Sequence, residues 1–206
     1  AVLMEGLGRG LAPSPYLASI VLGGGLVERA GSSEQKAAIL PALVAGEMLL
    51  AFAYAESSGR YDLARVEIRA EEKPDGWVLR GQKSVVFHAQ SADKLIVSAA
   101  VSEGEGISLF LLDRGASGVD LRTYPTIDGL RAAEVKLDGA YAEVLGVLGE
   151  ALPVVETVMD RAIIAVCAEA LGIMQTLIEM TRAYLAEREQ FGIAIGKFQV
   201  LQHTLV

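Results

Sequence analysis

The last third of the chain has apolar residues at helical spacing. They recur every three or four positions from residue 152 onward and predict one long helix. A break that contains Gly192 and Gly196 ends this helix, and the start of a second helix follows up to Val206. The apolar positions that carry the pattern are Val155, Val158, Met159, Ala162, Ile163, Val166, Ala170, Ile173, Met174, Leu177 and Met180.

The first 47 residues also predict helices. Residues 1–10 predict the end of one helix, and a proline-containing connector leads to a second helix over Tyr16–Arg29, despite its three glycines. Ser32 and Gln35 stand at the spacing of a capping box, so they predict the start of a third helix that runs to about Ala45. The N-terminal part is therefore expected to be helical.

Residues 49–145 change to strand-length segments separated by Gly, Asp and Pro, with turns predicted at residues 73–76, 103–106 and 128–129. No crossover helix fits between the segments, so we predict an antiparallel barrel or sandwich. The order of helices, strands and helices indicates an α+β fold. The predicted strands are Leu49–Glu56, Val66–Glu72, Trp77–Val86, Lys94–Ala100, Ile107–Leu112, Val119–Thr123 and Ala133–Leu137.

Composition limits the classes of partner. The chain has 206 residues, 52% hydrophobic content and a net charge of −8, which indicate a folded protein that binds neither nucleic acid nor anionic membrane. No uninterrupted apolar run approaches the roughly 18 residues of a membrane span. Asp160, Arg161 and Glu169 interrupt the most apolar helix, so we predict a buried helix of a soluble protein. The single Cys167 and the lack of a secretory signal favour the cytoplasm.

Several common chemistries are not supported. Two histidines and one cysteine at wide spacing predict no zinc site. The segment Gly192–Lys197 lacks the spacing of a phosphate-binding loop, and no serine stands in a G-x-S-x-G elbow. The glycines at positions 6, 8 and 10 follow no strand, so we interpret them as a flexible helix end rather than a dinucleotide fingerprint.

A cationic cluster is predicted at the break near the C-terminus. Arg182, Arg188 and Lys197 crowd the ends of two helices there, which favours an anionic phosphate ligand. A solvated charged corner between two core helices explains the same residues equally well.

The break itself carries a longer motif. It has the form R-x-Q-F-G-x-x-I-G-x-F-Q-x-x-Q-H from Arg188 to His203, which resembles the signature of the acyl-CoA dehydrogenase family of FAD enzymes. Ala194 stands where the family commonly has proline. The match of ten identities at fixed offsets is far more specific than a single glycine motif.

Two further stretches resemble the same family. Residues 52–62 are similar to its T-E-P-x-A-G-S-D loop, and Glu56 and Asp62 keep their spacing while Arg60 and Tyr61 replace glycine and serine. Residues 77–93 are similar to W-x-L-x-G-x-K-x-W-I-T-N-x-x-x-A-D. There Val85, Phe87 and His88 replace tryptophan, threonine and asparagine.

The resemblance covers essentially the whole chain and implies three domains. Residues 1–47 would end an N-terminal helical domain, residues 48–148 would form a middle β domain, and residues 149–206 would begin a C-terminal helical domain. The expected protein is thus a central fragment, truncated at both ends.

The resemblance also implies which residues bind ligands. Asp160 is similar to a family acid near the CoA portion of the substrate, and Tyr61 is expected to contact substrate as well as cofactor. Arg188 and its neighbours are expected to reach the FAD of an adjacent subunit. The cofactor-binding residues implied in this way are Phe52, Tyr54, Ala55, Arg60, Tyr61, Val85, Phe87, Arg188, Gln190, Phe191, Phe198 and Gln199.

The catalytic residue is not assigned. The family reaction removes an α-proton from an acyl-CoA thioester and transfers a β-hydride to N5 of FAD, which requires a carboxylate with a raised pKa. Some members carry this glutamate at the position of Ala162, which cannot act as a base. In most members it lies beyond the position of residue 206, so neither Glu156 nor Glu169 is nominated.

The leading hypothesis is an FAD-dependent acyl-CoA dehydrogenase that forms a dimer or tetramer and reduces an electron-transfer flavoprotein. The alternative is a non-catalytic FAD-binding small subunit of a heteromeric dehydrogenase, akin to those acting on pimeloyl-CoA, because departures cluster at the expected flavin contacts. A flavin-free scaffold of the same fold is a third hypothesis.

Overall fold

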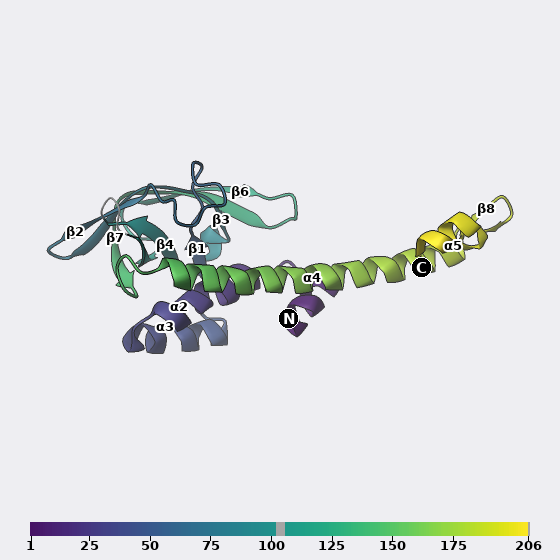
Figure 1. Ribbon diagram of the computed structural model, residues 1–206, viewed down its shortest axis with the longest axis horizontal. Helices are drawn as coiled ribbons and strands as arrows, with labels where there is room; N and C mark the ends of the chain where they lie inside the picture. The colour runs from purple at the N-terminus through teal and green to yellow at the C-terminus, as the bar shows by residue number, and fades with distance from the viewer. Residues whose placement is uncertain (102–105, 206) are drawn as a thin grey trace. The chain divides into compact units, whose positions relative to one another are not determined.

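The computed structural model describes residues 1–101 and 106–205, and these divide into two compact units. The larger unit is residues 14–163, and the smaller unit consists of residues 1–13 and 164–206 (Figure 1). Of the predicted turn at residues 103–106, residues 103–105 lie outside the described part of the chain. The predicted domain boundaries at residues 47 and 148 stay predictions.

The larger unit is built on a sheet whose seven strands in the described residues match the seven predicted segments in order. The ladder β4–β5–β7–β3–β2 returns to β4 through the pair Arg69 and Ala100, which closes a barrel; β1 lies beside β4 and β6 beside β7. The strands are β1 Leu50–Ala53, β2 Arg69–Lys73, β3 Gly76–Phe87, β4 Lys94–Ala100, β5 Ile107–Asp113, β6 Val119–Pro125 and β7 Arg131–Leu145.

The prediction of a purely antiparallel sheet is wrong at one edge. Strand β1 pairs with β4 in parallel over its whole length, and β2 meets β4 in parallel at one residue pair. Parallel neighbours need a long connection but not a helix. Here residues 54–93 supply the connection as a loop followed by the β2–β3 hairpin.

Strand β7 is much longer than the predicted segment Ala133–Leu137. The sequence Asp138–Gly139 has the composition of a turn, yet the strand continues to Leu145. Gly139 has φ +77° at a register shift between β3 and β7, so it is the extra residue of a β-bulge. Because of the bulge, the pairing of β7 with β3 continues beyond Gly139 instead of ending there.

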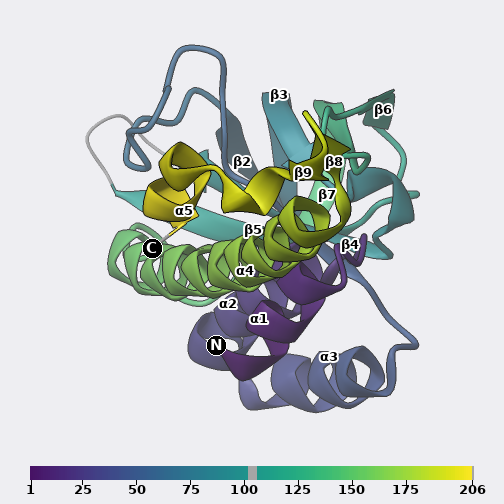
Figure 2. The ribbon, with the colours of Figure 1, turned by 90° about the vertical axis from the view of Figure 1, so that its right-hand side faces the viewer.

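One face of the sheet is covered by helices of the same unit (Figures 1 and 2). The predicted helix over Tyr16–Arg29 is a π-helix at Leu17–Gly24 followed by α2 at Gly25–Ala30. The helix α3, Ser33–Ala45, begins at the predicted capping box, in which Ser32 Oγ accepts from Gln35 N–H at 3.2 Å. Apolar side chains from these helices, from β1 and from the first turns of α4 form one core, and a second core fills the barrel.

The smaller unit contains α1, Val2–Arg9, packed against part of α4. The helix α4 runs over Leu152–Glu187, and its residues from 164 onward belong to this unit. A Cβ placed on Gly8 would lie 2.1 Å from the carbonyl oxygen of Glu169, and one on Gly172 would lie 2.1 Å from that of Glu5. Of the glycines at positions 6, 8 and 10, Gly8 is therefore a packing position.

The predicted break after the long helix is confirmed. A two-stranded hairpin, β8 Glu189–Gln190 and β9 Ile193–Ala194, follows α4. A short 3-10 turn at Ile195–Lys197 then leads into α5, Gln199–Leu205.

The prediction that the long helix is buried is wrong for most of its length. Among the described residues α4 is the one helix that is long and apolar enough to cross a membrane, yet only 11% of its most apolar stretch is buried. Length and composition alone are weak indications of a span, because core helices of soluble proteins share them. Buried apolar side chains on α4 end at Ala165, since the described smaller unit offers only α1, the hairpin and α5 as neighbours.

Candidate functional site

The loop between β1 and β2, residues 54–68, is the centre of the candidate site. It is a series of tight turns in which Gly59 N–H donates to the carbonyl of Glu56 and Asp62 N–H donates to that of Gly59. Arg60 has φ +51°, a conformation that non-glycine residues rarely adopt. The loop contacts β3, because Ser84 N–H donates to the Ala55 carbonyl at 2.8 Å.

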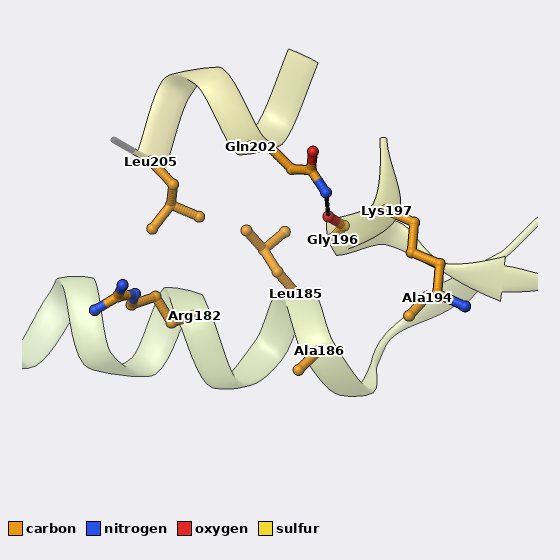
Figure 3. Close-up of a pocket in the computed structure, with 8 residues that line it drawn as sticks. All are labelled: Arg182, Leu185, Ala186, Ala194, Gly196, Lys197, Gln202 and Leu205. Atoms are coloured by element: carbon orange, nitrogen blue, oxygen red, sulfur yellow. Dashed lines mark hydrogen bonds between the residues drawn. The ribbon is translucent and has the colours of Figure 1, made fainter. Parts of the chain in front are cut away.

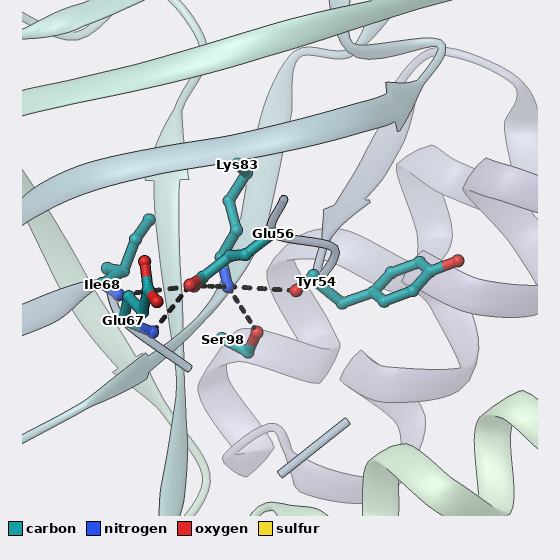
Figure 4. Close-up of polar contacts among 6 residues, drawn as sticks. All are labelled: Tyr54, Glu56, Glu67, Ile68, Lys83 and Ser98. Carbon is teal, nitrogen blue, oxygen red and sulfur yellow. Dashed lines mark hydrogen bonds and ion pairs between the residues drawn. The ribbon is translucent and has the colours of Figure 1, made fainter. Parts of the chain in front are cut away.

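A buried ion pair fixes this loop to the sheet (Figure 4). Lys83 Nζ lies 2.7 Å from Glu56 Oε1, and both side chains are almost fully buried. The ammonium group also donates to the Tyr54 carbonyl at 3.1 Å and to Ser98 Oγ at 3.0 Å, so its three donors are all used.

The carboxylate of Glu56 holds the far end of the same loop. Its Oε2 accepts from Glu67 N–H at 2.6 Å, and its Oε1 accepts from Ile68 N–H at 3.3 Å. One carboxylate thus connects the start of the loop, its end and β3. Burial lowers the pKa of Lys83 to about 8, and the charge and hydrogen bond of Glu56 act in the opposite direction.

Two hollows in the larger unit share part of this loop as a wall. We call the one beside β3 the bulge hollow, with a volume of about 490 Å³, and the one beside α4 the helix hollow, with a volume of about 390 Å³. Ala55, Arg60 and Tyr61 line both. The remaining lining residues of the bulge hollow are Glu56, Ser57, Ser84 and Val85, and those of the helix hollow are Tyr54, Leu63, Glu156, Met159, Asp160 and Ile163.

The bulge hollow suits a partly polar ligand. Val85, 44% exposed, supplies an apolar surface, while Arg60 supplies a positive charge at the rim. The Oγ of Ser58, next to the lining residue Ser57, is buried without a hydrogen-bond partner.

The helix hollow combines charges of both signs with apolar walls. Arg60 and Tyr61 come from the loop, and Glu156 and Asp160 come one turn apart from α4. Tyr61 is fully exposed, and burial raises the pKa of Tyr54 at the inner wall. This arrangement suits a ligand that has both an apolar and a polar part.

The predicted site residues of the larger unit largely come together. Tyr54, Ala55, Arg60, Tyr61, Val85 and Asp160 line one or both hollows. Phe52 is only 3% exposed and packs within the core beneath the loop, where its ring centroid is 5.2 Å from that of Tyr54. Phe87 is partly exposed at the end of β3 but lines neither hollow.

The predicted residues of the smaller unit surround the hairpin. Phe191 has φ +55° and is 93% exposed, and its ring meets that of Phe198 edge to face at 6.2 Å. Arg188, Gln190 and Gln199 are also exposed. These side chains are therefore accessible to solvent.

The cationic cluster predicted at the break is more dispersed than expected. A hollow of about 460 Å³ between α4, the 3-10 turn and α5 is lined by Arg182 and Lys197 but not by Arg188 (Figure 3). The two charged groups lie at opposite ends of this hollow. Gln202 Nε2 donates to the Gly196 carbonyl at 3.0 Å and closes the turn between them.

Sequence reasoning missed the polar groups that support the loop. Lys83 stands within a motif that implies no role for it, and Ser98 interrupts the apolar run of β4. A lone serine inside a strand that is buried on both faces was the available signal, because a buried hydroxyl needs a partner. Glu156, which is not nominated as a base, lines the helix hollow.

Comparison with known families identifies two segments. The family model described as "Acyl-CoA dehydrogenase, middle domain" matches residues 51–140. The model described as "Acyl-CoA dehydrogenase, C-terminal domain" matches residues 150–206, which include all of α4. The two matches together cover most of the chain and both hollows.

Individual relatives agree with these matches. A mitochondrial isovaleryl-CoA dehydrogenase of Oryza sativa subsp. japonica is 30% identical over 186 residues, which are 86% of this chain and 46% of the relative. The solved structure of the "Tcur3481-Tcur3483 steroid ACAD G363A variant" is 35% identical with a TM-score of 0.85, over 99% of this chain and 54% of that one. A glutaryl-CoA dehydrogenase from Mycobacterium smegmatis in complex with FADH2 is 26% identical with a TM-score of 0.85, over 92% and 50%. The chain thus spans about half the length of these relatives.

Proposed function

Because this chain belongs to the acyl-CoA dehydrogenase family, we propose that its protein carries out FAD-dependent α,β-desaturation of an acyl-CoA thioester. The observation that carries the proposal is the loop at residues 54–62, which forms a shared wall of two adjacent hollows. A redox cofactor and its substrate must lie side by side for a hydride to pass between them, and two hollows with one common wall satisfy that requirement.

The bulge hollow is proposed to receive the flavin. Val85 and Ala55 provide apolar contacts, and Arg60 provides charge. When bound, FAD supplies a hydride acceptor. The role of this chain is to hold the cofactor against β3 and to keep the loop in place through Glu56 and Lys83.

The helix hollow is proposed to receive the thioester part of the substrate. Met159 and Ile163 offer apolar surface to an acyl chain, whereas Arg60, Tyr61 and Asp160 offer polar contacts to the CoA side. These residues bind and orient the substrate. The base that removes the α-proton is not assigned to any residue of this chain.

An oligomer is proposed from the hairpin in the smaller unit. Phe191 is 93% exposed, and Arg188 and Gln199 are exposed beside it, so their side chains are available to a ligand of another subunit. The family resemblance assigns these positions to the FAD of an adjacent subunit. An electron-transfer flavoprotein is the proposed electron acceptor on the same basis.

A second candidate function is that of a non-catalytic FAD-binding subunit in a heteromeric dehydrogenase. Val85, Phe87 and Arg60 depart from the family pattern at the expected flavin contacts. These departures are the observation that supports an assembly with a related chain.

The experiment is a visible absorption spectrum of the full-length protein, expressed alone and titrated without oxygen with a panel of acyl-CoA thioesters. A flavin band that bleaches with one thioester supports a self-sufficient dehydrogenase. A flavin band that persists with every thioester supports the partner-subunit hypothesis. A protein with no flavin band, even after FAD is added, contradicts both for the isolated protein.

A further inference from the structure

Strand β3 contains a bulge that forms one wall of the bulge hollow. Lys83 pairs with Val135 and Val86 pairs with Ala133, so Ser84 and Val85 together oppose the single residue Glu134. Val85 has φ +53°. A β-branched residue in this left-handed region is a backbone outlier, so the surrounding structure must hold it there.

The side chain of Glu134 accepts hydrogen bonds beside the bulge. Its carboxylate accepts from Gln82 Nε2 at 3.1 Å and from Tyr124 OH at 3.0 Å. Ser84 and Val85, which stand opposite Glu134 in the ladder, also lie close enough to lower the pKa of its carboxylate. These donors come from β3 and β6, and the acceptor comes from β7, so one side chain connects three strands at the bulge.

The charge state of Glu134 fits this number of donors. An ionised carboxylate only accepts hydrogen bonds and has about four lone-pair sites, so it can receive both Gln82 and Tyr124. Burial acts to raise the pKa of Glu134, but the hydrogen bonds from Ser84, Gln82 and Tyr124 outweigh it, and the pKa lies below its ordinary value. The group is therefore ionised at neutral pH.

The bulge is also joined to the loop on the other side of the hollow. Ser84 and Val85 line the bulge hollow, and Ser84 N–H donates to the Ala55 carbonyl at 2.8 Å. A change in the bulge would therefore move both the apolar surface of Val85 and the loop that carries Arg60.

We propose that Glu134 is a positioning residue for the cofactor: it holds the Ser84–Val85 bulge so that Val85 presents its apolar surface to the flavin ring. This inference rests on the proposed function, because it takes the flavin as the ligand of the bulge hollow. Glu134 does not line that hollow and acts through the backbone of Val85.

The test compares E134Q with E143Q in the full-length protein. Glutamine keeps the size of Glu134 but turns an amide N–H₂ toward groups that are themselves donors. E134Q is expected to bind FAD at least tenfold more weakly, and its bound flavin is expected to have a shifted absorption band. Glu143, exposed on the same strand and without a side-chain hydrogen bond in the described residues, serves as the matched control and is expected to behave as the wild type.

A second readout does not depend on FAD. Amide hydrogen exchange of a peptide that covers residues 84–86 is expected to be faster in E134Q than in E143Q. If E134Q is too unstable to study, Q82A removes one donor and leaves the carboxylate in place. It is then expected to weaken FAD binding by a smaller factor.

The outcomes separate this inference from the proposed function. Unchanged exchange in E134Q overturns the inference, and so does faster exchange with unchanged FAD affinity. If the wild type itself binds no FAD, the proposed function fails and the flavin-positioning role fails with it. Amide hydrogen exchange of residues 84–86 in E134Q then still decides whether Glu134 holds the bulge.

Coupling between Glu134 and Val85 gives a further check. Glycine adopts φ +53° without strain, so V85G removes the need for an external support. E134Q is expected to accelerate exchange of residues 84–86 by a much smaller factor in the V85G background. An equal factor in both backgrounds would mean that Glu134 acts elsewhere.

Discussion

Lys83 and Glu56 form a charged pair inside the barrel, where unpaired charges are strongly disfavoured. Removing one partner of a buried pair leaves the other charge without compensation. We predict that K83M lowers the free energy of unfolding by about 3–5 kcal/mol, as measured by urea denaturation. It should also weaken FAD binding, because Glu56 holds both ends of the loop that carries Arg60.

The matched control is another lysine of the same sheet. Lys94 pairs with Asp113, but this pair is partly exposed to solvent. K94M is expected to change the free energy of unfolding by less than about 1 kcal/mol, because exposed pairs contribute little. Equal effects of K83M and K94M would contradict the structural role given to the buried pair.

The lowered pKa of Lys83 makes stability depend on pH in the alkaline range. In the folded protein its pKa is about 8, whereas the ordinary value in an unfolded chain is 10.5. Between these values the unfolded chain binds more protons than the folded one. The free energy of unfolding should therefore rise with pH from about 8 to 10.5, by at most about 1.4 kcal/mol per pH unit.

The measurement is a series of urea denaturation curves across that pH range, for the wild type and K83M. The Lys83 contribution is fully present above pH 10.5 and lost as the pH falls through 8. The unfolding free energy of the wild type minus that of K83M should therefore grow as the pH rises through this window. A difference that is constant with pH would show that Lys83 titrates normally.

At the scale of elements, two glycines set how closely α1 and α4 approach. A Cβ at Gly8 or Gly172 would overlap a backbone carbonyl of the opposite helix. We predict that G8A and G172A each lower the free energy of local opening of α1 by about 1–3 kcal/mol, because backbone atoms cannot move aside individually. Native-state hydrogen exchange of the α1 amides measures this quantity.

The other glycine of α1, Gly6, provides the control. Gly6 is exposed, and a Cβ there would meet nothing within 4 Å. G6A is expected to stabilise α1 by about 0.5–1 kcal/mol, since alanine loses less backbone entropy than glycine in a helix. Destabilisation by G6A would mean that helix packing is not the reason for the glycines.

At the scale of the whole molecule, FAD binding should slow the hydrogen exchange of two regions. The slowing should depend on protein concentration in only one of them. If FAD binds in the bulge hollow and contacts the hairpin of another subunit, residues 54–61 gain protection within one chain. Residues 188–199 gain protection only in an oligomer. We expect FAD to slow exchange of residues 188–199 more at high than at low protein concentration, because association follows mass action.

Hydrogen exchange with mass spectrometry, with and without FAD at two protein concentrations, gives the answer. Residues 33–45 of α3 serve as an internal reference, because they line neither hollow. Protection of residues 188–199 that is independent of concentration would contradict the role of a second subunit.

Local features of the structure were predictable because they depend on neighbours in the sequence. The capping box of Ser32 and Gln35, the seven strands and the break after the long helix all follow from short-range spacing. The loop residues Arg60 and Tyr61 were recognised because they stand inside a motif with fixed offsets. The resemblance in turn identified the family, which the comparisons confirmed.

Features that depend on distant residues could not be predicted in this way. The parallel pairing of β1 with β4 joins segments separated by residues 54–93, and nothing local indicates its direction. The continuation of β7 past Gly139 depends on the partner β3, since the same dipeptide in isolation favours a turn. The apolar side of α4 predicted burial, but burial requires a partner surface and not only an apolar sequence.

By itself the sequence determined the kind and order of the elements and the family to which they belong, because hydrophobic period and motif spacing are local properties of the chain. Only the tertiary structure decided how the site is built. It brought Lys83, Glu56 and Ser98 together under one loop, set Arg60 between two hollows, and placed Glu134 beside the Val85 bulge. The physical reason is that buried polar groups must find partners in space, and those partners come from strands that are far apart in the sequence.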